Sequence, residues 1–138
     1  MRKIYSFLLF FIVLNNHYNL HAQGDPQLQW VFNAVNASVI GGSTDGRSIA
    51  VDAAGNRYVT GYFIRTADFD PSVATANLTS IGGTQDPFIA KYDANGNYLW
   101  AKTMGGTGSD YANGVALNSS GQVHITGYFQ GTADFNPS

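Results

Sequence analysis

The chain has 138 residues and a formal net charge of −2, and its nine acidic residues are all aspartate. Glutamate favours helix interiors and aspartate favours turns, so this usage, with 16 glycines and 14% aromatic residues, predicts a β-rich and turn-rich protein. The mild charge argues against a nucleic-acid-binding domain, and the lack of cysteine excludes disulfides and thiolate chemistry.

Residues 1–22 are predicted to be a secretory signal peptide. Arg2 and Lys3 precede an unbroken apolar run at residues 7–14, and the small residue Ala22 follows a polar stretch. The alternative, a membrane anchor, needs about 20 apolar residues, and no cysteine follows the run to carry a lipid. We therefore expect a protein that is secreted or held on the outer cell surface, without a membrane span once the signal is removed.

The region after the signal begins with a leading strand predicted at residues 29–35 (QWVFNAV). After a glycine-rich loop, residues 48–52 (SIAVD) and 57–63 (RYVTGYF) are expected to be two strands joined by a turn. In that turn Asp52 can accept backbone hydrogen bonds, and Gly55 can adopt a positive φ.

The strand at residues 57–63 carries large uncharged side chains on both faces. One face has Val59, Gly61 and Phe63, and the other has Tyr58, Thr60 and Tyr62. A sheet with one face in water would show polar alternation, so both faces are expected to be covered. Gly61 and its counterpart Gly127 are interpreted as places where a neighbouring sheet approaches closely.

Residues 64–85 are expected to form a long connection rich in small and polar residues. Pro71 excludes a central strand there, and Phe69 is predicted to tuck into the body and hold the loop. Two further strands, at residues 86–93 (DPFIAKYD) and 98–104 (YLWAKTM), are joined by a second turn that begins with aspartate.

The pattern then starts again. A loop at residues 105–110 leads to strands predicted at residues 112–118 and 122–129. Residues 55–72 and 121–138 contain the repeated motif, and over 22 aligned positions the two copies lie 66 residues apart and share 11 residues. Self-similarity at a fixed period is the mark of a repeat architecture.

The predicted fold is all-β, a partial β-propeller built from four-stranded antiparallel blades. Residues 23–138 would form the repeat region, with copies near 46–104 and 111–138, or about one and a half blades plus the leading strand. A duplicated β-sandwich is the alternative, but apolar residues on both strand faces favour blades. Propellers have roughly 4–8 blades, and the sequence stops within a repeated motif, so we expect a fragment of a larger protein with further blades.

Four short motifs carry a family resemblance. They are D-x-x-G-N-x-Y-V-T-G from Asp52, D-x-F-I-A-K-Y from Asp86, G-N-x-x-W from Gly96 and G-G-x-x-x-D from Gly105. The pattern resembles the bacterial SBBP-type β-propeller repeat family, a seven-bladed type found in secreted proteins. The resemblance covers nearly all of residues 29–138, although the second copy departs at Asn118, Gln122 and His124. It implies a secreted, non-catalytic repeat domain of a larger bacterial surface protein.

No catalytic, cofactor or metal site is predicted. His124 is the single histidine after residue 22, stands where the first copy has Tyr58, and is interpreted as a packing residue. Asp93, Asn95 and Asn97 copy the start of a calcium loop, but the EF-hand glycine and glutamate are missing at the sixth and twelfth positions. A turn is therefore the favoured interpretation.

A weaker calcium candidate is the pair Asp68 and Asp70 in the long connection, with Asp134 and Asn136 at the equivalent positions. The alternative is that these side chains cap the loop, and it is favoured. Three Asn-x-Ser/Thr sequences fit the glycosylation pattern but arise easily in such a composition; they begin at Asn36, Asn77 and Asn118.

These features predict a non-catalytic binding or scaffold module of a secreted or cell-surface bacterial protein. Its partner would be a protein or a carbohydrate, bound by loops at one end of the propeller. One alternative is a piece of an extracellular hydrolase or lyase that acts on polysaccharide and has its catalytic residues elsewhere. Another is a structural repeat in an adhesin array.

Overall fold

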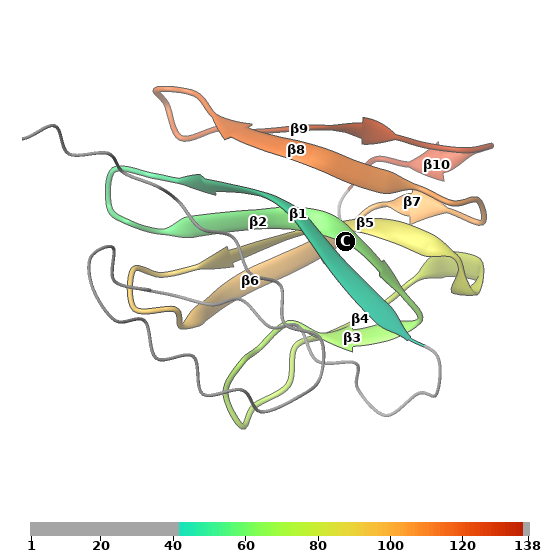
Figure 1. The fold of residues 1–138 in the computed structure, drawn as a ribbon, viewed down its shortest axis with the longest axis horizontal. Coiled ribbons are helices and arrows are strands. Elements are labelled where there is room, and N and C mark those ends of the chain that lie inside the picture. Colours follow the sequence, from blue (N-terminus) through green and yellow to red (C-terminus); the bar gives the residue numbers. More distant parts are fainter. Residues whose placement is uncertain (1–41, 137–138) are drawn as a thin grey trace, which may run out of the picture. The chain divides into compact units, whose positions relative to one another are not determined.

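The computed structural model describes residues 42–136, which are all-β with antiparallel sheets and one short 3-10 helix. Four strands form one sheet in the order β1-β2-β5-β6 (Figure 1). They are β1 (Ser43–Val51), β2 (Arg57–Ile64), β5 (Gln85–Tyr92) and β6 (Tyr98–Thr103). This antiparallel meander confirms the predicted four strands per period, and it is called the first blade below.

A second blade begins with β8 (Tyr111–Leu117) and β9 (Val123–Tyr128), which form an antiparallel pair. Figure 1 shows this pair beside β1 and β2, and β8 contacts both of those strands. The predicted signal peptide, the leading strand at residues 29–35 and the sequence at Asn36 lie outside the described residues.

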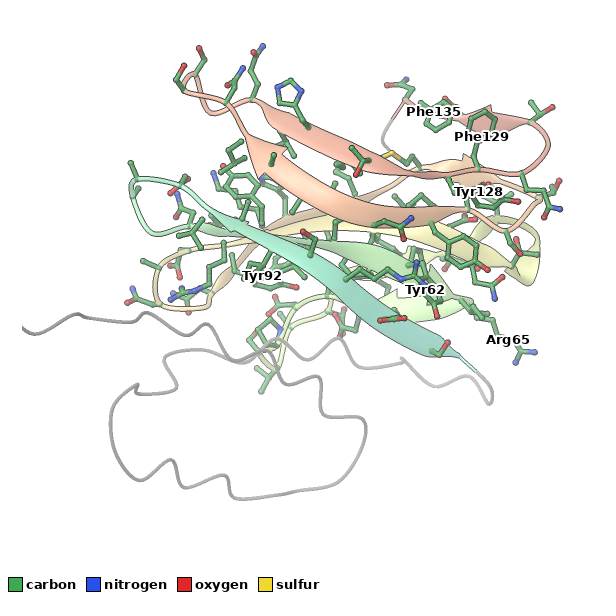
Figure 2. The ribbon with its side chains drawn as sticks, turned by 45° about the horizontal axis from the view of Figure 1, so that its top comes forward. Tyr62, Arg65, Tyr92, Tyr128, Phe129 and Phe135 are labelled. Atoms are coloured by element: carbon green, nitrogen blue, oxygen red, sulfur yellow. The ribbon has the colours of Figure 1, made fainter. Side chains whose placement is uncertain are left out.

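The long connection is more ordered than the sequence predicts. Strand β3 (Thr66–Asp68) pairs with β4 (Asn77–Thr79), and the 3-10 helix η1 (Ile81–Gly83) follows. Arg65, labelled in Figure 2, turns the chain between β2 and β3 with φ 65°. Pro71 lies outside both strands, as predicted. The short strands themselves were not predicted, because strands of three residues are too short to show a periodic pattern.

The two blades are joined by another short pair that the sequence did not predict. Strand β7 (Gly105–Gly106), from the connection that leaves the first blade, pairs with β10 (Ala133–Asp134) of the second. Glycine and alanine are not typical strand residues, and the ladder forms because the next copy of the loop lies alongside. The prediction of a plain loop at residues 105–110 was therefore wrong.

Strand β1 begins earlier than predicted, at Ser43 rather than at residue 48. The ladder with β2 contains a β-bulge at Arg47, so the alternation of side chains is interrupted there. This interruption makes Asp45 and Gly46 look like a loop in the sequence, whereas both pair with β2. Strand β8 has the same bulge at Asn113, 66 residues later.

The repeated glycine of the TGYF motif has a different reason from the one predicted. A Cβ on Gly61 would overlap the carbonyl oxygen of Asp45 on the paired strand, and a Cβ on Gly127 would overlap that of Tyr111. The close approach therefore comes from the strand's own ladder partner beside the bulge, not from a neighbouring sheet. Glycine is needed because any side chain would push that strand away.

Both faces of β2 are covered, as predicted. On one face Phe63 is fully buried and lies edge-on to Phe69 and Phe88, at 5.6 and 6.5 Å between ring centroids. Phe69 comes from the long connection, and the Tyr92 hydroxyl donates a hydrogen bond to its carbonyl oxygen at 2.8 Å. Phe69 thus holds the loop on the blade, which confirms its predicted role.

No helix in residues 42–136 is long and apolar enough to cross a membrane.

Candidate interaction surface

The two bulges bring a polar and aromatic group together where the blades meet. Its members are Arg47 on β1, Tyr62 on β2, Tyr111 and Asn113 on β8, and Tyr128 at the end of β9. They are called the inner-strand cluster below. Arg47 and Asn113 occupy the same repeat position, and the Arg47 guanidinium donates a hydrogen bond to the Asn113 side-chain oxygen.

The guanidinium of Arg47 lies over two tyrosine rings. Its carbon is 4.8 Å from the ring centroid of Tyr62 and 5.2 Å from that of Tyr111. The two rings meet edge to face at 4.9 Å, and Arg47 Nε lies 3.7 Å from the Asp45 carboxylate. Partial burial raises the pKa of the Tyr62 phenol, and the neighbouring Asp45 carboxylate adds to this effect.

The cluster is open to solvent on its outer side. Arg47 and Asn113 are exposed, Tyr128 is 54% exposed, and Tyr62 and Tyr111 are half-buried. Stacking orders the arginine, so its guanidinium presents donors without a large loss of side-chain freedom on binding. Sequence analysis missed these residues because a bulge has no signature of its own, although the paired tyrosines of the repeat pointed to this position.

The proposed calcium-loop start at Asp93 is a turn, as predicted. The Asp93 carboxylate accepts hydrogen bonds from the backbone N–H groups of Asn95 and Asn97, at 2.8 and 2.9 Å, and from the Asn97 side chain. These bonds lower the pKa of Asp93. Asp52 and Asn118 accept the equivalent pair of backbone N–H bonds in the two other turns. The side-chain bond differs, because Asp52 accepts one from the Asn56 amide whereas the Asn118 amide donates one to Gln122.

The aspartates of the long connection cap their own loop. Asp68 accepts hydrogen bonds from the backbone N–H groups of Asp70 and Ala76, at 3.0 and 2.8 Å, and Asp70 accepts one from Ser72. Asp134 accepts the equivalent bond from the Asn136 N–H at 2.8 Å. The capping interpretation is thus confirmed. Within residues 42–136 no group of three or more His, Cys, Asp or Glu side chains could hold a metal ion.

His124 lies on β9 opposite Ala116 and is exposed, so the prediction that it packs inside a blade was wrong. In the first blade the strand β5 pairs with β2 and helps to bury Tyr58. Among the described residues of the second blade no equivalent strand pairs with β9. Of the other candidate modification positions, Asn77 is exposed on β4 and Asn118 holds a turn.

A buried carboxylate pair was not predicted. Asp86 and Asp110 are 0% and 1% exposed. Asp110 accepts hydrogen bonds from the N–H groups of Gly106 and Gln130, at 2.8 and 2.7 Å, and Asp86 Oδ2 accepts one from Ile81. Asp86 Oδ1 has no partner among the described residues. Burial raises the pKa of Asp86 to about 6, and the charge of Asp110 contributes.

This pair has a structural position rather than a catalytic one. Three of the four oxygens accept bonds from backbone groups, and the Gln130 N–H belongs to the second blade. Burial separates both carboxylates from any substrate in solution. Both aspartates belong to motifs that the sequence shows, D-x-F-I-A-K-Y and G-G-x-x-x-D, and both stand beside apolar strands. Charged residues are rarely buried without a specific reason, so an aspartate in such a place could have been recognised as a candidate.

Comparison with known proteins shows a similarity to a WD repeat-containing protein. An uncharacterized WD repeat-containing protein of Acanthamoeba polyphaga mimivirus is 33% identical over an alignment of 88 residues that covers 59% of this chain and 6% of the relative. The chain therefore spans only a small part of that protein's length. No family model and no solved structure matches the sequence. WD repeats form four-stranded propeller blades with a period of roughly 40–45 residues, so the similarity agrees with a propeller-like repeat.

Proposed function

We propose that this chain is a non-catalytic propeller segment of an exported bacterial protein and that it binds a protein or carbohydrate through the inner-strand cluster. The observation that carries the proposal is the exposed residue Arg47, whose guanidinium lies over Tyr62 and Tyr111 at the blade junction. Arginine and tyrosine are enriched among the residues that supply most of the energy at binding interfaces. Ordering before binding lowers the entropic cost.

Several sequence features support the wider context. The leader-like segment at residues 1–22 supports export, and the repeat motifs support an origin in the SBBP-type family. Similarity to a WD repeat-containing protein supports a repeat-based binding or scaffold module. The hydrolase or lyase alternative remains a prediction, and the buried Asp86 and Asp110 do not serve as its acid pair.

The test applies the full chain to an array of defined polysaccharides and of purified bacterial surface proteins. For a probe that binds, Arg47→Ala is expected to weaken affinity about ten-fold. Arg47→Lys should also weaken it, because a compact ammonium does not stack as the planar guanidinium does. Leu99→Ala, which changes an exposed side chain on β6, is the control.

Two results would contradict the proposal. If Arg47→Ala and Tyr111→Ala bind the probe as tightly as the unchanged chain, the ligand contacts another surface. If the polysaccharides on the array release shorter products, the hydrolase or lyase alternative gains direct support.

A further inference from the structure

Two buried carboxylates hold the connection that leaves the first blade. Strand β7 pairs with β10 of the second blade and contacts both η1 and β5 of the first (Figure 1). Asp86, near the start of β5, accepts a hydrogen bond from the Ile81 N–H of η1. Asp110 accepts one from the Gly106 N–H of β7 and one from the Gln130 N–H of the second blade. The two side chains therefore fasten three segments at the junction of the blades.

One of the four carboxylate oxygens has no hydrogen-bond donor. Asp86 Oδ1 is buried and has no partner among the described residues. It lies beside Asp110, because a Cβ placed on Gly105 would be 3.1 Å from Asp86 Oδ1 and 2.9 Å from Asp110 Oδ2. Burying an ionised oxygen without a donor is unfavourable, and a second negative charge beside it adds to the cost. A proton on Asp86 Oδ1 relieves both, because it turns this acceptor into a donor next to Asp110.

The strands around Asp86 bring no positive charge to the pair. The face of β5 that carries Asp86 also carries Tyr92, but at the far end of the strand. Lys91 and Lys102 belong to the opposite face of the sheet, since Lys102 is paired with Ile89. The charge that acts on Asp86 is that of Asp110, and it is negative.

The segments that donate hydrogen bonds to the pair also lack a cation. They have no titratable side chain and are residues 80–84, 104–109 and 129–133. Asp134 is paired with Gly105, but it is exposed and accepts a hydrogen bond from the Asn136 N–H. Arg65, which follows β2, is exposed, and Figure 2 shows its side chain extending away from the strands. A bound proton is therefore the means by which the pair keeps a single negative charge.

We propose that Asp86 and Asp110 share one proton and that losing it loosens the junction between the two blades, which makes this junction sensitive to pH. The proton leaves to water, and the pair passes from one negative charge to two. The carboxylates then repel each other, and the N–H groups of Ile81, Gly106 and Gln130 lose their fixed acceptors. The inference goes beyond the proposed function and does not depend on a ligand at the inner-strand cluster.

The pH range of the effect follows from the closed and the open junction. In the closed junction burial raises the pKa of Asp86 to about 6, and opening to solvent returns this pKa towards 3.8. The closed form therefore holds the proton more tightly, and the junction opens more easily as the pH rises. Between pH 5 and pH 8 these pKa values increase the equilibrium constant for opening about ten-fold.

Amide hydrogen exchange of the full chain, measured by NMR, tests for this local opening. Protection factors correct for the intrinsic pH dependence of exchange, and they are compared at pH 5 and pH 8 for the N–H groups of Ile81, Gly106 and Gln130. We expect protection that is about ten-fold lower at pH 8. Ile89, on the strand between β2 and β6, should be better protected at both pH values. If the three junction amides are protected as strongly as Ile89 at each pH, they open only with the whole chain and the proposal is overturned.

Asp86→Asn separates the proton from other causes. The variant keeps an acceptor for the Ile81 N–H and cannot ionise, so its junction amides should have equal protection at pH 5 and pH 8. His124→Gln is the matched control, because a histidine titrates in this pH range and His124 is exposed on β9. This control should keep the ten-fold change. A pH response that persists in Asp86→Asn, or that disappears in His124→Gln, would contradict the proposal.

A titration of the unchanged chain needs no variant. The side-chain carboxyl carbons of Asp86 and Asp110 are followed by ¹³C NMR as the pH is raised. Because the two groups share a proton, both signals are expected to shift together in a step near pH 6. Independent shifts at about pH 4, the ordinary range of aspartate, would show that no proton is shared and would overturn the proposal.

Discussion

Replacing Asp86 by asparagine removes a buried negative charge without changing the size of the side chain. The amide oxygen of the substituted side chain can still accept the hydrogen bond from the Ile81 N–H that Asp86 Oδ2 accepts at 2.7 Å. The amide nitrogen replaces Oδ1, which has no partner among the described residues, and it lies on the side of the neighbouring Asp110. The substitution therefore preserves the one bond present and removes the repulsion between two carboxylates.

The size of the effect follows from the pKa. Burial raises the pKa of Asp86 from 3.8 to about 6, so the folded chain binds this proton more tightly than the unfolded chain. The contribution of Asp86 to stability is then complete below about pH 4 and is lost as the pH rises to about 6. A difference of about two pH units corresponds to about 2–3 kcal/mol in the free energy of unfolding. The asparagine of the variant cannot ionise and should not show this loss.

Urea unfolding of both proteins from pH 4 to pH 8 tests the effect. The stability difference, Asp86→Asn minus the unchanged chain, should rise by about 2–3 kcal/mol between pH 4 and pH 7. The pKa values of Asp52 and Asp93 are lowered, so the stability that these residues contribute is lost as the pH falls. This loss occurs in both proteins and therefore cancels in the difference between them. A difference that stays constant with pH would refute the reasoning.

Asp110→Asn is the matched control, because it makes the same chemical change on the other carboxylate. Both Asp110 oxygens accept backbone hydrogen bonds, at 2.8 and 2.7 Å, so an amide nitrogen would face a donor. This variant should therefore lose about 1–3 kcal/mol at pH 7, the cost of an unsatisfied buried group. If Asp86→Asn raises the free energy of unfolding at pH 7 and Asp110→Asn lowers it, then the hydrogen bonds of each carboxylate, and not its charge alone, decide the effect of the substitution.

Three further changes test the fold. Tyr92→Phe should lower stability by about 1–3 kcal/mol in urea unfolding, because it leaves a buried backbone carbonyl without its donor. Gly61→Ala should lower the free energy of unfolding by about 2 kcal/mol or more, because its Cβ would overlap the paired strand. Gly46→Ala, on that paired strand, would meet only Val59 at 3.8 Å and should lower it less. Equal losses for the two variants would contradict the close approach at Gly61. Asp52→Ala should lower the melting temperature more than Asp52→Asn, because the second copy uses an asparagine in this turn; the reverse order would contradict the bonding assigned to it.

Much of the first blade could be predicted because its strands and turns are encoded locally. The alternation of residues 57–63 predicted the two covered faces of β2, and Asp52 with Gly55 predicted the turn before it. The bulge at Arg47 could not be predicted, because it depends on how β1 meets β2 and not on a local preference. The missed start of β1 at Ser43 follows from that bulge.

The site was harder to predict than the fold because its residues meet only across the repeat. Arg47 and Asn113 are 66 residues apart, and their contact requires the two blades to lie side by side. Asp86 and Asp110 likewise lie close together only through the folded connection around Gly105. His124 shows the reverse case: it is exposed although its counterpart Tyr58 is buried, and within residues 42–136 only β8 pairs with its strand.

The positions that the two copies share and the positions at which they differ have different roles in the structure. Positions that the copies share, such as Gly61 with Gly127 and the bulge itself, set the backbone of the inner strands. The bulge residue differs, with Arg47 in one copy and Asn113 in the next, and both are exposed. A repeated backbone that displays a different side chain in each blade can vary its ligand without changing its fold. If the chain binds through the inner-strand cluster as proposed, substitutions at the bulge positions should change ligand affinity, and substitutions at the shared positions should change stability.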